Sequence, residues 1–132
     1  MKKTIFILLA ALTFQGSAQV KEGYYKSTRS VYMDYNSNGE VIDERIYMDT
    51  TLLHITNNGF RVLYEIHNWG VFYPWIFIKQ AEDRNYLYTV YEENACKINI
   101  EKGFFLYYYN FNDTTGFYNK GLNYINLKYI HE

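Results

Sequence analysis

The chain has 132 residues, of which 13 are basic and 14 acidic, so its formal net charge is −1. This balance argues against nucleic acid or an anionic membrane surface as a partner, because such partners select basic proteins. Aromatic residues make up 20% of the chain, and 16 of them are tyrosines. One buried aromatic side chain removes about 150–250 Å² from water, so a dense core is expected. Because Cys96 is the single cysteine, no intramolecular disulfide can form.

Residues 1–18 have the pattern of a secretory signal peptide. Lys2 and Lys3 precede an apolar run over 5–12, and small residues lead to Ala18; these are the positive, hydrophobic and cleavage regions of such peptides. The run is shorter than the ~20 residues that a membrane-spanning helix needs. We therefore expect cleavage after Ala18 and a periplasmic or secreted product without a membrane span. That product, residues 19–132, has 11 basic and 14 acidic residues, a net charge of −3.

Short extended runs alternate with turns along the rest of the chain. The first run, 24–35, is rich in β-forming residues and leads into the turn 36–39, which ends in Asn-Gly, the strongest short-range hairpin signal. A second turn, Asn57-Asn58-Gly59, separates two further runs of the same kind. The predicted strands, in chain order, are 24–35, 41–48, 51–56, 60–67, 74–80, 86–92, 95–100, 104–111, 117–118 and 122–131.

The connections between these runs decide how the strands pair. Most connections have two to five residues, whereas a parallel crossover needs a dozen or more. We therefore expect one all-β domain over 19–132, built as an antiparallel meander of eight to ten strands. A twisted sheet of this size curls into a barrel or splits into a sandwich. Sequential hairpins favour an up-and-down β-barrel, with a β-sandwich as the alternative.

One segment departs from the alternation of inward apolar and outward polar residues. In 60–66, Phe60 and Val62 share one face, while Arg61 and Glu65 share the other, as expected of a sheet with one wet face. The segment 104–111, FFLYYYNF, is apolar on both faces. We expect one face of this strand in the core and the other in contact with something else.

The first strand also carries a family resemblance. Gly23-Tyr24-Tyr25 partly matches the Gly-x-Trp motif that opens lipocalins, with Tyr in place of Trp. With the expected barrel, the chain resembles a small secreted lipocalin-like (calycin) β-barrel protein. It departs from that pattern at the end of the chain, where the last strand offers Lys128 but no arginine, and no C-terminal helix follows. The resemblance implies a barrel that holds one hydrophobic small molecule.

Two features could contact a ligand. Arg29 shares the more apolar face of its strand with Tyr25 and Val31, and its guanidinium could bind a ligand carboxylate bidentately; the alternative is a packed stem with its head in water. The segment 67–75 holds both tryptophans and the single proline. It is either a ligand-gripping loop at the barrel mouth or a hydrophobic plug that seals it.

No pattern for catalysis, a metal or a cofactor stands out. The three histidines have no metal-ligand spacing, and Cys96 shares an apolar face, as a buried structural thiol would. No serine nucleophile elbow or glycine-rich phosphate loop is present. We predict no enzyme, no metal site and no cofactor.

Three functions remain open. The first, which we favour, is a binding protein that holds a hydrophobic small molecule in a barrel cavity lined by Phe60, Tyr64, Tyr107 and Tyr109.

The second function is a carbohydrate- or peptide-binding surface, in which exposed Tyr and Trp rings stack on the ligand. It would use Trp69, Tyr73 and Trp75 beside Tyr107 or Tyr109. The third is a structural or interaction protein whose apolar patch forms a homodimer interface.

Overall fold

The computed structural model of the chain describes residues 20–90 and 94–132, and the expected signal peptide lies outside these ranges. The described residues confirm the predicted all-β class, because they form one antiparallel sheet of twelve strands and a single short 3₁₀ turn. The elements are β1 (Gly23–Ser27), β2 (Arg29–Tyr35), β3 (Val41–Tyr47), β4 (Thr51–Thr56), β5 (Gly59–Glu65), β6 (Asn68–Trp69), β7 (Tyr73–Gln80), η1 (Glu82–Arg84), β8 (Tyr86–Val90), β9 (Asn94–Asn99), β10 (Phe104–Asn112), β11 (Phe117–Ile125) and β12 (Lys128–His131).

The sheet is not closed into a barrel. Its strand order is β12-β1-β4-β5-β7-β8-β9-β10-β11-β2-β3, with β6 attached to β5, so β12 and β3 are free ends and the expected up-and-down closure does not occur. The meander runs from β7 to β11. The N-terminal run breaks at Thr28 into two strands, of which β1 pairs with β4 while β2 pairs with β11.

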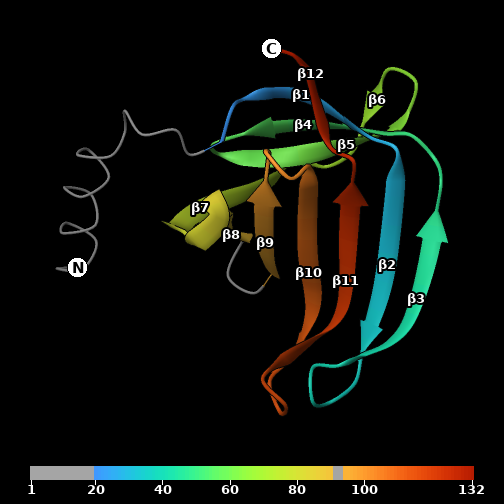
Figure 1. Cartoon of the computed structure of the whole chain (residues 1–132), viewed down its shortest axis with the longest axis vertical. Helices are drawn as coiled ribbons and strands as arrows, with labels where there is room; N and C mark the ends of the chain where they lie inside the picture. Colours follow the sequence, from blue (N-terminus) through green and yellow to red (C-terminus); the bar gives the residue numbers. More distant parts are fainter. Residues whose placement is uncertain (1–19, 91–93) are drawn as a thin grey trace, which may run out of the picture.

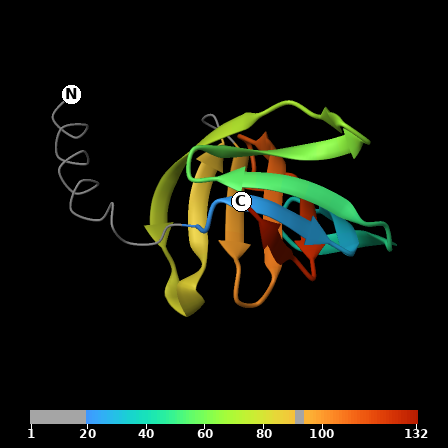
Figure 2. The same cartoon turned by 90° about the horizontal axis from the view of Figure 1, so that it is seen from above.

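The sheet instead folds over on itself. Strands β1, β4, β5 and β12 run across one end of the long strands β9, β10, β11, β2 and β3 (Figure 1). Seen from above, β1, β4 and β5 cross over β9–β11 (Figure 2). We call the side of the sheet on which the core lies the concave face; the long strands extend beyond the covering layer, so their lower half is open on this face.

The core between the two layers consists largely of aromatic rings. Trp75 stacks on Tyr88 with ring centroids 4.2 Å apart, and Phe60 meets Phe105 edge-on at 4.8 Å. Cys96 is 2% exposed, which confirms the buried thiol, and this burial raises the pKa of Cys96. Edge-to-face and offset pairs of this kind contribute beyond the area they bury, so the core is stable without a disulfide.

The turn expected before residue 122 is a strand. β11 runs without interruption from Phe117 to Ile125. A Cβ on Gly121 would lie 2.7 Å from the Tyr35 hydroxyl oxygen, so this glycine makes room for a ring and does not mark a turn. Asn126, whose φ is +57°, follows the end of the strand, and the Leu127 N–H then donates to the Gly103 carbonyl at 2.8 Å.

Candidate functional site

The register of the long strands builds an ordered surface on the concave face. Side chains directly opposite one another on antiparallel strands share a face and contact each other. Three such rows cross β10, β11, β2 and β3 in that order. The rows are Phe105–Tyr124–Ser30–Tyr47, Tyr107–Leu122–Tyr32–Arg45 and Tyr109–Lys120–Asp34–Asp43.

Strands β5 and β7 add two more tyrosines beside these rows. Tyr73 stacks on Phe60 with centroids 5.2 Å apart and lies 6.2 Å from Tyr107. Burial raises the pKa of Tyr73, and the neighbouring Tyr64 hydroxyl raises it further. Tyr64 therefore lies beside Tyr73. We call these side chains the tyrosine cluster, which comprises Tyr32, Tyr47, Tyr64, Tyr73, Tyr107, Tyr109 and Tyr124.

Several hydroxyl groups of the tyrosine cluster act on Tyr124. Burial raises the pKa of Tyr124, and the hydroxyls of Tyr32, Tyr64, Tyr109 and Tyr73 raise it further. These four hydroxyls therefore lie within electrostatic range of the Tyr124 hydroxyl.

Tyr107 belongs to the same group. Its ring stacks on Tyr109 with centroids 5.5 Å apart. Burial raises the pKa of Tyr107 to about 12, although the Asn94 amide, which donates to its hydroxyl at 2.9 Å, favours the ionised form. The cluster therefore combines stacked rings with hydroxyl groups, and the Tyr107 hydroxyl stays neutral at physiological pH.

Exposure increases from the inner to the outer members of the cluster. Tyr124 is only 8% exposed, whereas Tyr47 and Tyr64 are 46% and 67% exposed. Tyr32, Tyr107 and Tyr109 are half-buried. The inner tyrosines are thus fixed by the core, while the outer ones present ring faces and hydroxyls to solvent.

A balanced group of charges borders the cluster. Lys120 Nζ lies 2.8 Å from Asp34 Oδ1, and Arg45 contacts Asp34 at 3.6 Å and Asp43 at 3.7 Å. The Arg45 guanidinium also lies 5.9 Å from the centre of the Tyr32 ring. The hydrogen bond from Lys120 holds the pKa of Asp34 below its usual value. Two cations thus neutralise two carboxylates at this border.

The structure brings together six of the eight predicted site residues. One of the six, Trp75, is buried beneath the others. Phe60, Tyr73, Tyr107 and Tyr109 are linked by the ring contacts described above, and Tyr64 adjoins Tyr73. Trp75 is 5% exposed and 5.3 Å from Phe60, so its ring belongs to the core.

Arg29 and Trp69 lie apart from this group. Arg29 is opposite Ile125 in the ladder, on the reverse side of β2 from Ser30 and Tyr32, which excludes it from the concave face. Trp69 packs on the outer face of the covering layer, 5.7 Å from the Tyr24 ring and 5.7 Å from the Arg61 guanidinium.

Sequence reasoning missed the contribution of β2, β3 and β11. The prediction assumed that inward and outward positions alternate without a break through Thr28, which placed Tyr25 and Arg29 on one face. The chain instead bends at Thr28, so Tyr25 and Tyr32 both face the core. The alternation of β2 alone, with Tyr32 and Asp34 on the face opposite Val31, is the signal that could have found Tyr32.

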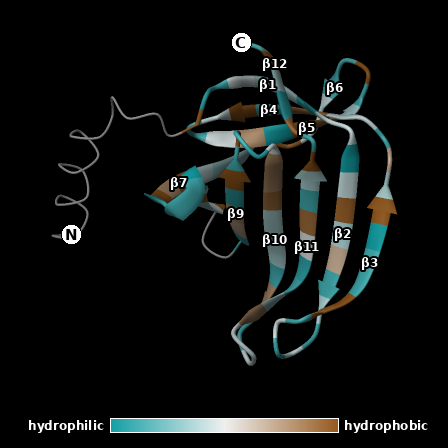
Figure 3. Ribbon diagram, viewed as in Figure 1, coloured by the Kyte–Doolittle hydropathy of each residue, from teal (hydrophilic) through white to brown (hydrophobic). Residues whose placement is uncertain are grey.

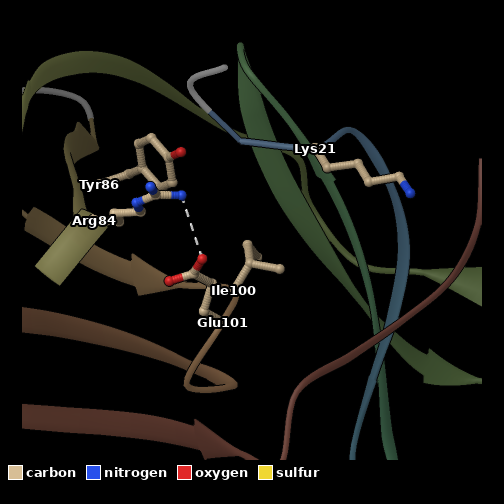
Figure 4. A pocket seen from close by; sticks show the side chains of 5 residues that line it. All are labelled: Lys21, Arg84, Tyr86, Ile100 and Glu101. Carbon is tan, nitrogen blue, oxygen red and sulfur yellow. Dashed lines mark hydrogen bonds and ion pairs between the residues drawn. The ribbon is translucent and has the colours of Figure 1, made fainter. Parts of the chain in front are cut away.

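Two small hollows of the described residues lie elsewhere. One has a volume of about 140 Å³, and the Arg84–Glu101 ion pair of 3.4 Å borders it (Figure 4). The other, of about 130 Å³, lies by Tyr35 and Tyr108 on the reverse face. Pockets for drug-sized ligands measure about 300–1,000 Å³. Neither hollow includes the predicted cavity residues.

Comparisons of the chain with protein-family models, with curated proteins and with solved structures found no match. The resemblance to lipocalins therefore stays a prediction. In residues 20–90 and 94–132, no three or more His, Cys, Asp or Glu side chains are grouped as metal ligands. The same ranges contain no helix long and apolar enough to cross a membrane.

Proposed function

We propose that this is a secreted or periplasmic binding protein whose tyrosine cluster binds a neutral glycan. The observation that supports this proposal is the grading of the cluster, from Tyr124 in the core to Tyr47 and Tyr64 at the surface. The core holds the inner rings of this surface before the ligand arrives, so these rings lose little conformational entropy on binding.

Tyrosine suits a sugar ligand chemically. Its ring packs against the apolar C–H face of a pyranose, and its hydroxyl both donates and accepts hydrogen bonds. Tyr64 and Tyr109 offer rings, while Arg45, Asp34 and Lys120 offer fixed donors and acceptors at the border. A chain of sugar hydroxyls alternating with apolar ring faces matches both features.

The charges favour a neutral sugar over an acidic one. Lys120 and Arg45 are already paired with Asp34 and Asp43, so these two cations at the border of the cluster are neutralised. An anionic glycan would have to displace a carboxylate from its partner, at a cost that a neutral glycan avoids.

A hydrophobic small molecule in an internal cavity fits the geometry less well. The Phe60 ring is 3% exposed and surrounded by Tyr73, Trp75, Phe105 and Tyr107. A lipid would need these rings to move apart. The cavity hypothesis stays a prediction, and the binding experiment described next tests it as well.

Calorimetric titration with a panel of neutral and acidic oligosaccharides tests the proposal. Tyr64→Ala and Tyr109→Ala should each weaken binding of a neutral glycan by about tenfold, the equivalent of ~1.4 kcal/mol. Tyr24→Ala is the matched control, because this half-buried tyrosine stacks on His54 on the outer face, and its glycan affinity should not change.

Two results would count against the proposal. The first is a glycan affinity that the Tyr64 and Tyr109 substitutions leave unchanged. The second is the absence of glycan binding combined with saturable uptake of a fluorescent fatty acid or with binding of an extended peptide, which would favour the cavity or a peptide surface instead.

A further inference from the structure

Strand β3 is an uncovered edge of the sheet. It is the last strand in the order, β2 is its ladder partner, and all seven residues from Val41 to Tyr47 are exposed. In Figure 1 it forms the outer side of the molecule. An edge strand presents unpaired backbone N–H and C=O groups, which native proteins cover or block.

Exposed apolar side chains flank the charged centre of this edge. Ile42 is 64% exposed, Ile46 57% and Met48, just after the strand, 72%, and Figure 3 shows hydrophobic segments of β3 on either side of a hydrophilic middle. Apolar residues gathered on an open backbone edge indicate a surface that is covered in the functional protein.

We propose that a second copy of the chain covers this edge, with the two β3 strands pairing antiparallel around a twofold axis at Glu44. A twofold axis perpendicular to the sheet keeps the same face of both copies on the same side. Two residues that oppose each other across the interface must therefore point to the same side of the sheet. This condition leaves only a few positions along the strand for the axis.

An axis at Glu44 gives a self-complementary edge. It sets Asp43 opposite the partner's Arg45 and, by symmetry, Arg45 opposite the partner's Asp43. Ile42 then lies opposite the partner's Ile46, and again this contact occurs twice. Opposite charges and apolar pairs at directly opposed positions stabilise a ladder. The one unfavourable pair is Glu44 with the partner's Glu44, on the axis.

The neighbouring registers lack this complementarity. An axis at Asp43 would set that carboxylate against its own copy and Arg45 against the partner's Val41. An axis at Arg45 would oppose two guanidinium groups and set Glu44 against the partner's Ile46. Each of the three registers opposes two like charges on its axis, which is destabilising. Only the register at Glu44 adds two Asp43–Arg45 pairs and two Ile42–Ile46 pairs, so it is preferred on charge and on apolar contact.

A local irregularity limits how far this pairing extends. The ladder between β2 and β3 shifts by one residue after Asp34↔Asp43, so that Tyr35 is opposite Val41 and Ile42 is the extra residue. Such a bulge bends the strand. The charged pairs on either side of Glu44 therefore specify the register, and Ile42 packs against the partner's Ile46 at the periphery.

Disulfide trapping tests the register directly. Directly opposed residues have Cα atoms about 4.5–5.5 Å apart, within the range that a disulfide bridges. Glu44→Cys should therefore give a covalent dimer under mild oxidation. Ile42→Cys is the matched control in the same strand, because the two copies of residue 42 would be about 14 Å apart. The native Cys96 is buried and should not react.

Charge exchange tests the same register without a crosslink. In sedimentation experiments, Asp43→Arg and Arg45→Asp should each raise the dimer dissociation constant at least tenfold, and the double variant should restore it. Circular dichroism would verify that each variant is folded. A monomeric wild-type protein at 100 μM or more, a dimer that Glu44→Cys does not trap, or a double variant without recovery would overturn the proposal.

Discussion

Phe60 connects the core to the tyrosine cluster. Its ring lies 4.8 Å from Phe105, which is fully buried, and 5.2 Å and 5.6 Å from Tyr73 and Tyr107 at the half-open end. Because packed interiors transmit a change of position from one side chain to the next, this phenylalanine fixes the orientation of the tyrosines that would meet a ligand. Strand alternation was sufficient to place it inward.

The phenol of Tyr107 gives the cluster a measurable pH dependence. Its pKa is raised to about 12 by burial, against about 10 in an unfolded chain. Between these values the unfolded chain loses this proton first, so the stability that the group contributes is complete below pH 10 and is lost as the pH rises towards 12. Tyr107→Phe should therefore flatten the alkaline loss of stability in denaturant titrations.

The matched control for this substitution is Tyr47→Phe, at the exposed end of the cluster. A Tyr107→Phe profile that falls as steeply as the wild type between pH 10 and 12 would show that this hydroxyl is not buried as described.

At the scale of elements, the surroundings of β10 explain why its sequence is apolar on both faces. Phe105 lies in the core and Tyr107 in the cluster, whereas Tyr108 on the reverse side lies 6.1 Å from Tyr35 and 5.7 Å from Tyr118. The reverse face of the strand is therefore half-buried by rings from β2 and β11, and both sides contact the protein itself.

The hairpin between β4 and β5 depends on a glycine for space. Gly59 has φ of +155°, and a Cβ there would lie 2.4 Å from the Tyr73 carbonyl oxygen, a backbone atom that cannot rotate away. Gly59→Ala should lower the free energy of unfolding by about 1–3 kcal/mol or more, measured by chemical denaturation. It should also disturb Tyr73 and hence the cluster.

Gly116 provides the comparison for Gly59. Its φ is +79°, but a Cβ there would meet nothing within 4 Å, so Gly116→Ala carries the backbone strain without the clash. Equal losses of stability in the two variants would contradict the close approach of β5 and β7.

The elements also show which parts of the structure follow from local sequence. Hairpin turns and alternation predicted most strands, as well as the inward positions of Phe60, Tyr107 and Tyr109. They failed where tertiary contacts decide the outcome. Gly121 looks like a turn residue, but it accommodates the Tyr35 ring, and the bend at Thr28 reverses the facing of β2 relative to β1.

At the scale of the molecule, the folded-over sheet determines what can bind. The covering layer seals one end of the long strands, and the other end stays open on the concave face (Figure 1). Short-range patterns cannot predict this arrangement, because β1 joins β4 and β2 joins β11 across long separations in sequence. These pairings bring Tyr32 and Tyr47 to the cluster, which is why local sequence did not indicate them.

The proposed dimer would extend this surface. Pairing through β3 around a perpendicular axis leaves both concave faces on the same side, which offers two glycan sites to one polymer and raises its effective affinity. This consequence depends on the proposed function, whereas the dimer itself does not.

The tyrosine ring resonances of the protein, followed by NMR during titration with a neutral oligosaccharide, test the central claim most directly. Binding at the concave face predicts shifts at Tyr64 and Tyr109, smaller ones at Tyr32 and Tyr107, and none at Tyr24. Shifts centred on Tyr24 and Trp69, or an unchanged spectrum across the whole panel of neutral sugars, would contradict it.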